Sequence, residues 1–184
     1  MRTELTNLRN ILCPTDLSPR SQRTLGFAAG IAERLGAKLS AVHCTSPPWF
    51  ARDEGTQQDE VEQITGLIET AANYDDGRRR EMRLSTYVME RRSDPAGDIL
   101  FLADEIPADL IVMKARPSVF SALHYGSIVE RVTSAAPCPV MLLPARFLRS
   151  EDTPEEISVE QVLFDYDFSQ ATERLYRTAM SLVA

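Results

Sequence analysis

Short apolar runs alternate with longer amphipathic stretches along most of the chain. Five runs fit buried strands, because each is short, apolar and bounded by turn-forming residues: residues 10–14, 38–44, 84–89, 108–113 and 139–143. Between them, apolar residues recur every three or four positions, which is typical of helices. This alternation predicts an α/β fold, a doubly wound parallel sheet with helices on both faces.

The best-defined helix begins directly after the first strand. Ser18 followed by Pro19 favours a helix start, because the hydroxyl can accept a hydrogen bond from an unpaired backbone N–H and proline fits the first helical position. Apolar residues then recur as far as Leu35, and Gly36 ends the helix. Further helices are predicted over residues 60–82, from residues 94–95 onward and over 126–136. Residues 114–125 are predicted to be a loop, or a loop that enters a helix.

Ligands of doubly wound sheets bind beyond the carboxyl ends of the strands, so the loops that follow the strands are the first candidates for a site. Thr15 and Asp16 follow the first strand, Val42 ends the second, and residues 114–127 follow the fourth. The carboxylate of Asp16 can accept hydrogen bonds from a sugar or a base. Alternatively, Asp16 caps the next helix or shapes the turn, and the residues alone leave these interpretations balanced.

Several segments in a fixed order resemble the universal stress protein family: residues 11–18, 97–100, 108–113, 126–132 and 136–140. Together they cover about residues 8–144, which is one whole domain. The resemblance implies a five-stranded parallel sheet in the order 3-2-1-4-5. It also implies a protein that is usually dimeric, in a family in which some members bind ATP and others do not.

The resemblance also suggests where a nucleotide would bind. ATP-binding members use the acid that matches Asp16, and the backbone at the end of the second strand holds adenine, which here is Val42. The candidate cofactor-binding residues are Thr15, Asp16, Val42, Lys114, Arg116, Ser118, Gly126 and Ser127. ATP, or another adenine nucleotide, is the cofactor to consider.

ATP-binding members place glycines after the fourth strand, in the order Gly, two residues, Gly, nine residues, Gly-Ser/Thr. Glycine lets backbone N–H groups approach phosphates closely. Residues 126–127 match the last part, but counting back gives Arg116 and Met113 at the glycine positions. Alignment on the strand instead puts Lys114 at the first glycine position and shortens the loop by one residue. Pro117 removes another N–H donor.

Two interpretations of this altered loop stay open. The side chains of Lys114, Arg116 and Ser118 hold phosphates in place of the backbone, or the pocket no longer takes ATP and the basic residues are solvated. The two missing glycines favour the second interpretation. We therefore expect a non-catalytic, regulatory universal stress protein domain that acts through dimerisation and partner binding, with ATP binding weak or lost. The alternative is a nucleotide-binding switch that uses Asp16 and residues 114–127.

Composition narrows the classes of partner. A formal net charge of -7 argues against nucleic-acid binding, and no apolar run approaches the ~20 residues of a membrane span. Cys13, Cys44 and Cys138 show no metal-binding spacing, so we expect no metal site and a reducing, cytoplasmic location. The strand Val140–Leu143 is expected to be an apolar sheet edge, which invites a homodimer with a second copy.

The length of 184 residues exceeds one such domain and falls short of two. Residues 1–148 are the expected domain, and 149–160 form an acidic linker. Residues 161–169 align without gaps on residues 10–18, which pairs Asp167 with Asp16 and Ser169 with Ser18. We expect residues 161–184 to be the first strand and helix of a truncated second, similar domain, as in a tandem protein. A generic strand–turn–helix or a native, swapped tail is the alternative.

Overall fold

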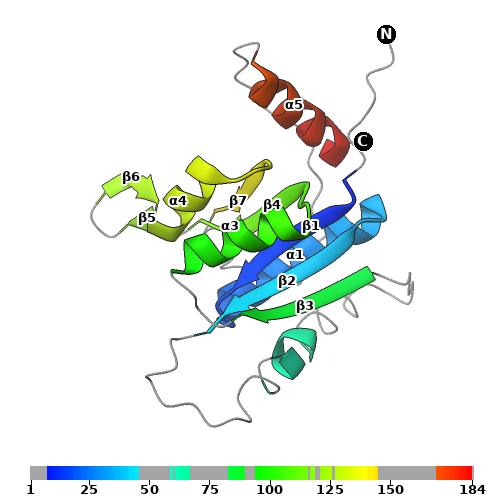
Figure 1. The fold of residues 1–184 in the computed structure, drawn as a ribbon, viewed down its shortest axis with the longest axis vertical. Coiled ribbons are helices and arrows are strands. Elements are labelled where there is room, and N and C mark those ends of the chain that lie inside the picture. Colours follow the sequence, from blue (N-terminus) through cyan, green and yellow to red (C-terminus); the bar gives the residue numbers. More distant parts are fainter. Residues whose placement is uncertain are drawn as a thin grey trace.

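The computed structural model describes residues 8–45, 59, 61–66, 83–89, 94–115, 117–118, 121–125, 127–144 and 169–183. Its centre is a five-stranded parallel sheet, shown in Figure 1. In chain order the strands are β1 (Asn10–Thr15), β2 (Lys38–Cys44), β3 (Arg83–Met89), β4 (Leu110–Lys114) and β7 (Val140–Leu143). Their order across the sheet is β3-β2-β1-β4-β7, which confirms the predicted 3-2-1-4-5 order and places β7 at an edge.

The labelled helices are α1 (Pro19–Leu35), α3 (Pro95–Glu105), α4 (Ser127–Ala135) and α5 (Gln170–Val183). Residues 61–66 are also helical. The predicted ends of α1 are confirmed. The Ser18 hydroxyl accepts a hydrogen bond from the backbone N–H of Ser21 at 3.3 Å. Gly36 ends the helix in the left-handed region with φ 64°, where a residue without Cβ avoids strain.

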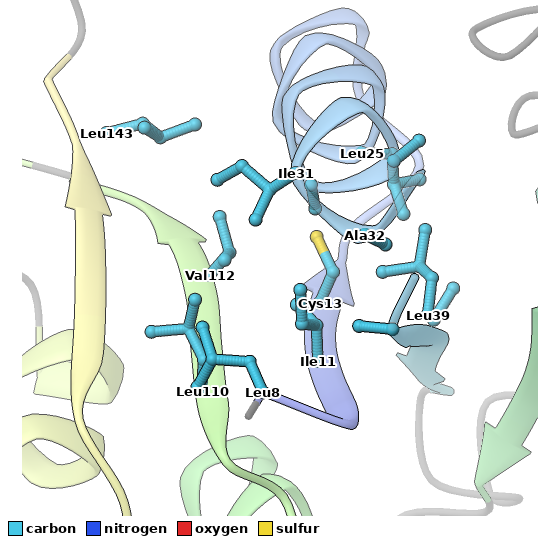
Figure 2. Close-up of a cluster of buried hydrophobic side chains, with 14 of the residues drawn as sticks. Leu8, Ile11, Cys13, Leu25, Ile31, Ala32, Leu39, Leu110, Val112 and Leu143 are labelled. Atoms are coloured by element: carbon cyan, nitrogen blue, oxygen red, sulfur yellow. The ribbon is translucent and has the colours of Figure 1, made fainter. Parts of the chain in front are cut away.

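The sheet is covered on both faces, as predicted. On one face α1 packs over a buried apolar cluster to which β1 contributes Ile11 and Cys13 (Figure 2). On the other face α3 and α4 cover a second cluster, which contains Leu12 and Val42. Neighbouring residues of one strand therefore belong to different clusters, because side chains alternate between the faces of a sheet.

The segment between β4 and α4 differs from its prediction. It was expected to be a loop, or a loop that enters a helix, but it contains a small antiparallel pair, β5 (Pro117–Ser118) and β6 (Ser121–Tyr125). The prediction of an uninterrupted loop was wrong because these strands are too short and too polar to give a clear apolar pattern. Figure 1 shows the pair projecting from the side of the domain next to α4.

Some predictions fall outside the described residues. Arg116, Gly126, the acidic linker at 149–160 and the strand predicted over 161–168 all lie there. The helical half of the C-terminal extension is described, as α5. No helix in the described ranges combines the length and the apolar character that crossing a membrane requires.

Candidate functional site

The chain order of the strands places the candidate site between β1 and β4. The chain proceeds from β1 to β2 and β3 on one side, and then returns to β4 and β7 on the other. Ligands of doubly wound sheets bind at such a switch point. β1 and β4 pair at only two positions, the second joining Leu12 to Ile111. Continuing that register sets Lys114 opposite Thr15. Pro14 lies beyond the last paired residue of β1 and has no backbone N–H to donate to β4.

An ion pair joins the two strand ends. The Lys114 Nζ lies 2.5 Å from Asp16 Oδ2 and donates to the Oγ atoms of Ser18 and Ser21, each at 3.0 Å. The two serine hydroxyls in turn donate to Asp16 Oδ1, that of Ser18 at 2.6 Å. The Lys114 side chain is only 20% exposed, whereas that of Asp16 is 46% exposed. The ammonium is therefore held inside a closed network of polar groups from β1, α1 and β4.

This network fixes the charge of Asp16. Partial burial alone would raise the pKa of the carboxyl group. The hydrogen bonds from Lys114, Ser18 and Ser21, together with the charge of Lys114, outweigh that effect and hold the pKa well below its usual range. Asp16 is therefore a stable anion near neutral pH and a weak base.

The turn between β1 and α1 is held by side chains. Asp16 Oδ1 accepts the Ser18 N–H at 3.2 Å, the Asp16 N–H donates to Ser21 Oγ at 3.3 Å, and Thr15 Oγ1 accepts the Leu17 N–H at 3.1 Å. Leu17 adopts φ 58°, a left-handed conformation that costs a residue with Cβ about 1–2 kcal/mol. The surrounding bonds stabilise this conformation. Asp16 thus shapes the turn, while the helix cap itself is Ser18.

The other predicted residues take different positions. Thr15 is buried beside the pair, and its carbonyl accepts a hydrogen bond at 2.9 Å from Nδ1 of His43, which therefore carries the proton. The Val42 side chain is fully buried in the core, so only its backbone is relevant to a ligand. Ser118 lies in β5 and Ser127 begins α4. The structure thus brings Thr15, Asp16 and Lys114 together.

The β5–β6 pair changes what the segment after β4 can offer a phosphate. Ser118 faces Ser121 and Pro117 faces Tyr125 in antiparallel register. Pairing of this kind engages backbone N–H groups with the opposite strand. A phosphate loop instead needs several N–H groups directed at the ligand. The segment is therefore poorly suited to surround a chain of phosphates.

Sequence reasoning missed two members of the network. Ser18 was recognised only as a helix cap, and Ser21 was not considered, although both accept from Lys114. A signal was present, because Ser18 and Ser21 are three residues apart at a helix start and face the same side. In the described part of the chain, no three His, Cys, Asp or Glu side chains converge as they would at a metal ion.

The sequence of this domain matches a known protein family. The model of the universal stress protein family matches residues 7–144. The chain belongs to that family. A universal stress protein from Archaeoglobus fulgidus aligns with 25% identity and a TM-score of 0.58, over 73% of this chain and 97% of that one. No match was found among the curated proteins.

Two similar structures contain nucleotides. A universal stress protein in complex with cAMP aligns with 20% identity and a TM-score of 0.55, over 74% of this chain and 97% of that one. The universal stress protein from Archaeoglobus fulgidus in complex with dAMP aligns with 24% identity and a TM-score of 0.55, over 73% of this chain and 96% of that one. At these identities the likeness establishes the shared fold.

Proposed function

We propose that this universal stress protein domain has a non-catalytic, regulatory role in a stress response, with ATP binding weak or lost. It works through dimerisation and through binding a protein partner. The observation that carries the proposal is the Asp16–Lys114 ion pair at the switch point of the sheet. The ion pair occupies the carboxylate that a nucleotide sugar or base would use.

Both carboxylate oxygens of Asp16 already accept hydrogen bonds. Lys114 donates to Oδ2, and Ser18 and Ser21 donate to Oδ1. A ligand hydroxyl that takes the place of the half-buried ammonium at Oδ2 would leave Lys114 in need of a new partner. Leaving a buried charge without a partner is costly, so a neutral sugar competes poorly for this carboxylate.

The phosphate end supports the same proposal. A triphosphate needs several donors or a metal ion to balance its charge, and Lys114 is already paired with Asp16. The β5–β6 pair engages backbone in the segment that would surround the phosphates, and Pro117 has no N–H to offer. The low pKa of Asp16 makes it a poor general base, which favours a non-catalytic role.

The edge strand β7 supports dimerisation. The carbonyls of Pro139 and Leu143 accept from β4, from Ile111 at 3.0 Å and Ala115 at 2.8 Å. Because backbone groups of alternate residues point to opposite sides of a strand, Val140 directs its N–H and C=O away from β4. An edge of this kind can pair with the same edge of a second copy.

A second candidate is a nucleotide-binding switch, favoured by the related structures with cAMP and dAMP. Each of those ligands carries a single phosphate. In this alternative, a single phosphate takes the Lys114 ammonium from Asp16, and the freed carboxylate accepts from the sugar. Opening of the ion pair is then the switch.

Mass spectrometry of small molecules released from denatured, purified protein tests the proposal. We expect no nucleotide above trace amounts. ATP at near-stoichiometric amounts would contradict the proposal. A nucleotide with one phosphate at near-stoichiometric amounts would also overturn it, in favour of the switch.

A further inference from the structure

The helix α5 packs on the domain through an unusual face. The residues that it buries are Thr178, Ser181 and Leu182, which are 2%, 5% and 6% exposed. Two arginines fix its position: Arg174 donates to the carbonyl of Pro137 at 2.9 Å, and Arg34 of α1 donates to the carbonyl of Leu182. Two of the three buried side chains carry hydroxyl groups.

Two other large apolar residues of α5 lie on the opposite side. Leu175 and Met180 are 42% and 38% exposed, among the few large apolar side chains at the described surface. Thr172, Tyr176 and Ala179 lie between them on the same helical face and are half-buried. We call these five residues the α5 stripe. An amphipathic helix normally buries its apolar stripe, but α5 buries Thr178 and Ser181 beside Leu182 instead. Thr178 Oγ1 has no hydrogen-bond partner among the described residues.

The alignment of residues 161–169 on residues 10–18 relates the exposed side of α5 to α1. Extended without gaps from Asp167 on Asp16, it pairs the α5 stripe with residues of α1 that are all buried against the sheet: Ser21, Thr24, Leu25, Ala28 and Ala29. The side of α5 that packs on this domain matches the outer side of α1 only in part, because Thr178 and Leu182 correspond to the half-buried Phe27 and the buried Ile31. Arg174 and Ser181 correspond to Arg23 and Gly30, which are exposed. The stripe therefore occupies the positions with which a helix of this fold covers a sheet.

We propose that α5 is a joint between two domains. Its buried face is seated on this domain, and the α5 stripe covers the apolar sheet face of a second domain of the same fold, carried by the same polypeptide. The face that it requires resembles the one beneath α1, where Ile11, Cys13 and Leu39 are fully buried (Figure 2). A second copy of the described domain offers no such face, because α1 covers one side of its sheet and α3 and α4 cover the other.

Thiol labelling, with peptide mass spectrometry to separate the native cysteines, tests this joint. In the 184-residue chain, the new cysteine of Met180→Cys is expected to react with the label at the rate of an exposed thiol. The new cysteine of the matched control, Thr178→Cys, is buried and is expected to react only when α5 transiently leaves the domain. The second sheet is then supplied by adding residues 34–144 of this chain after Ala184, the position at which the internal alignment continues without a gap. We expect labelling of Met180→Cys to slow at least about tenfold, because covered thiols react through opening.

Two results would overturn the joint. One is an unchanged labelling rate of Met180→Cys in the extended chain, while hydrogen exchange shows that the amides of the added segment are protected and the segment is therefore folded. The other is slow labelling in the 184-residue chain that depends on protein concentration, since a second copy then covers the stripe.

A further measurement needs no added segment. The double variant Leu175→Glu/Met180→Glu of the 184-residue chain keeps its Tm, because these two side chains are exposed on the described domain. Thr178→Glu, on the buried face, lowers the Tm. A Tm loss in the double variant equal to that of Thr178→Glu shows that the stripe packs on its own domain and contradicts the proposal.

Discussion

Lys114 places an ammonium group at the carboxyl end of the sheet. A glycine at this position would leave open space and a backbone N–H close to a ligand. The lysine instead brings its own ammonium, which Asp16 and two serine hydroxyls hold at 2.5–3.0 Å. The lysine side chain thus takes up the acidic group of the candidate site.

The low pKa of Asp16 predicts an acid-sensitive contribution to stability. Because folding lowers this pKa, the contribution is complete above the pKa of unfolded aspartate, about 3.9, and is lost as the pH falls below it. Urea unfolding between pH 3 and 7 measures this effect. The difference in unfolding free energy between the wild type and Asp16→Asn should stay constant above about pH 5 and narrow below it. A difference independent of pH contradicts the ion pair.

A second residue, Asp98, has a buried carboxylate oxygen whose desolvation no hydrogen bond offsets among the described residues. Asp98 of α3 is 3% exposed, and its Oδ2 has no hydrogen-bond partner in the described part of the chain. Removing a buried, unsatisfied polar group relieves its desolvation penalty, so Asp98→Ala should raise the unfolding free energy by about 1 kcal/mol. Asp98→Asn keeps a buried polar group and should change it less. Destabilisation by Asp98→Ala in urea unfolding would show that the carboxylate has a partner in solution.

At the scale of elements, α3 depends on the residue that begins it. Asp94 accepts the N–H groups of Ala96 and Gly97 at 3.0 and 3.3 Å, and it pairs with Arg131 of α4 at 2.7 Å. Asp94→Ala removes the cap and the ion pair and should cost about 1–2 kcal/mol of unfolding free energy. Asp94→Asn retains the cap and should cost only a few tenths of a kcal/mol. Equal losses in the two variants would assign the effect to the ion pair instead.

The elements themselves were largely predictable. The α1 signals at Ser18 and Gly36 act over a few residues, and each apolar run gave a strand within two residues of its observed bounds. The β5–β6 pair was not predictable, because its pairing depends on contacts between segments rather than on a local pattern. The Asp16–Lys114 contact was also hidden. It requires the register of β1 on β4, which joins residues 98 positions apart.

At the scale of the whole molecule, the two ends of the sheet carry different features. The ion pair lies at the carboxyl end. α5 lies at the amino end, because it contacts Arg34 ahead of β2 and Pro137 ahead of β7. In Figure 1, α5 stands beside the start of β1. The candidate site and the proposed joint are therefore separated by the length of the strands.

The edge strand gives a prediction for the assembly. The wild-type chain should sediment as a dimer at micromolar concentration. Val140→Pro removes an N–H that points away from β4, so the sheet inside the domain should keep its pairing while the dimer is lost. A wild type that stays monomeric at this concentration contradicts dimerisation, and a dimeric Val140→Pro variant contradicts this interface.

Calorimetric titration with ATP tests the central claim most directly, because the claim is that Lys114 closes the site. We expect no saturable binding to the wild type below about 1 mM, which corresponds to a binding free energy weaker than about -4 kcal/mol. Lys114→Gly should bind more tightly, since it frees Asp16 and restores the glycine of ATP-binding relatives. Micromolar, stoichiometric binding to the wild type, unchanged or weakened in Lys114→Gly, would contradict the account.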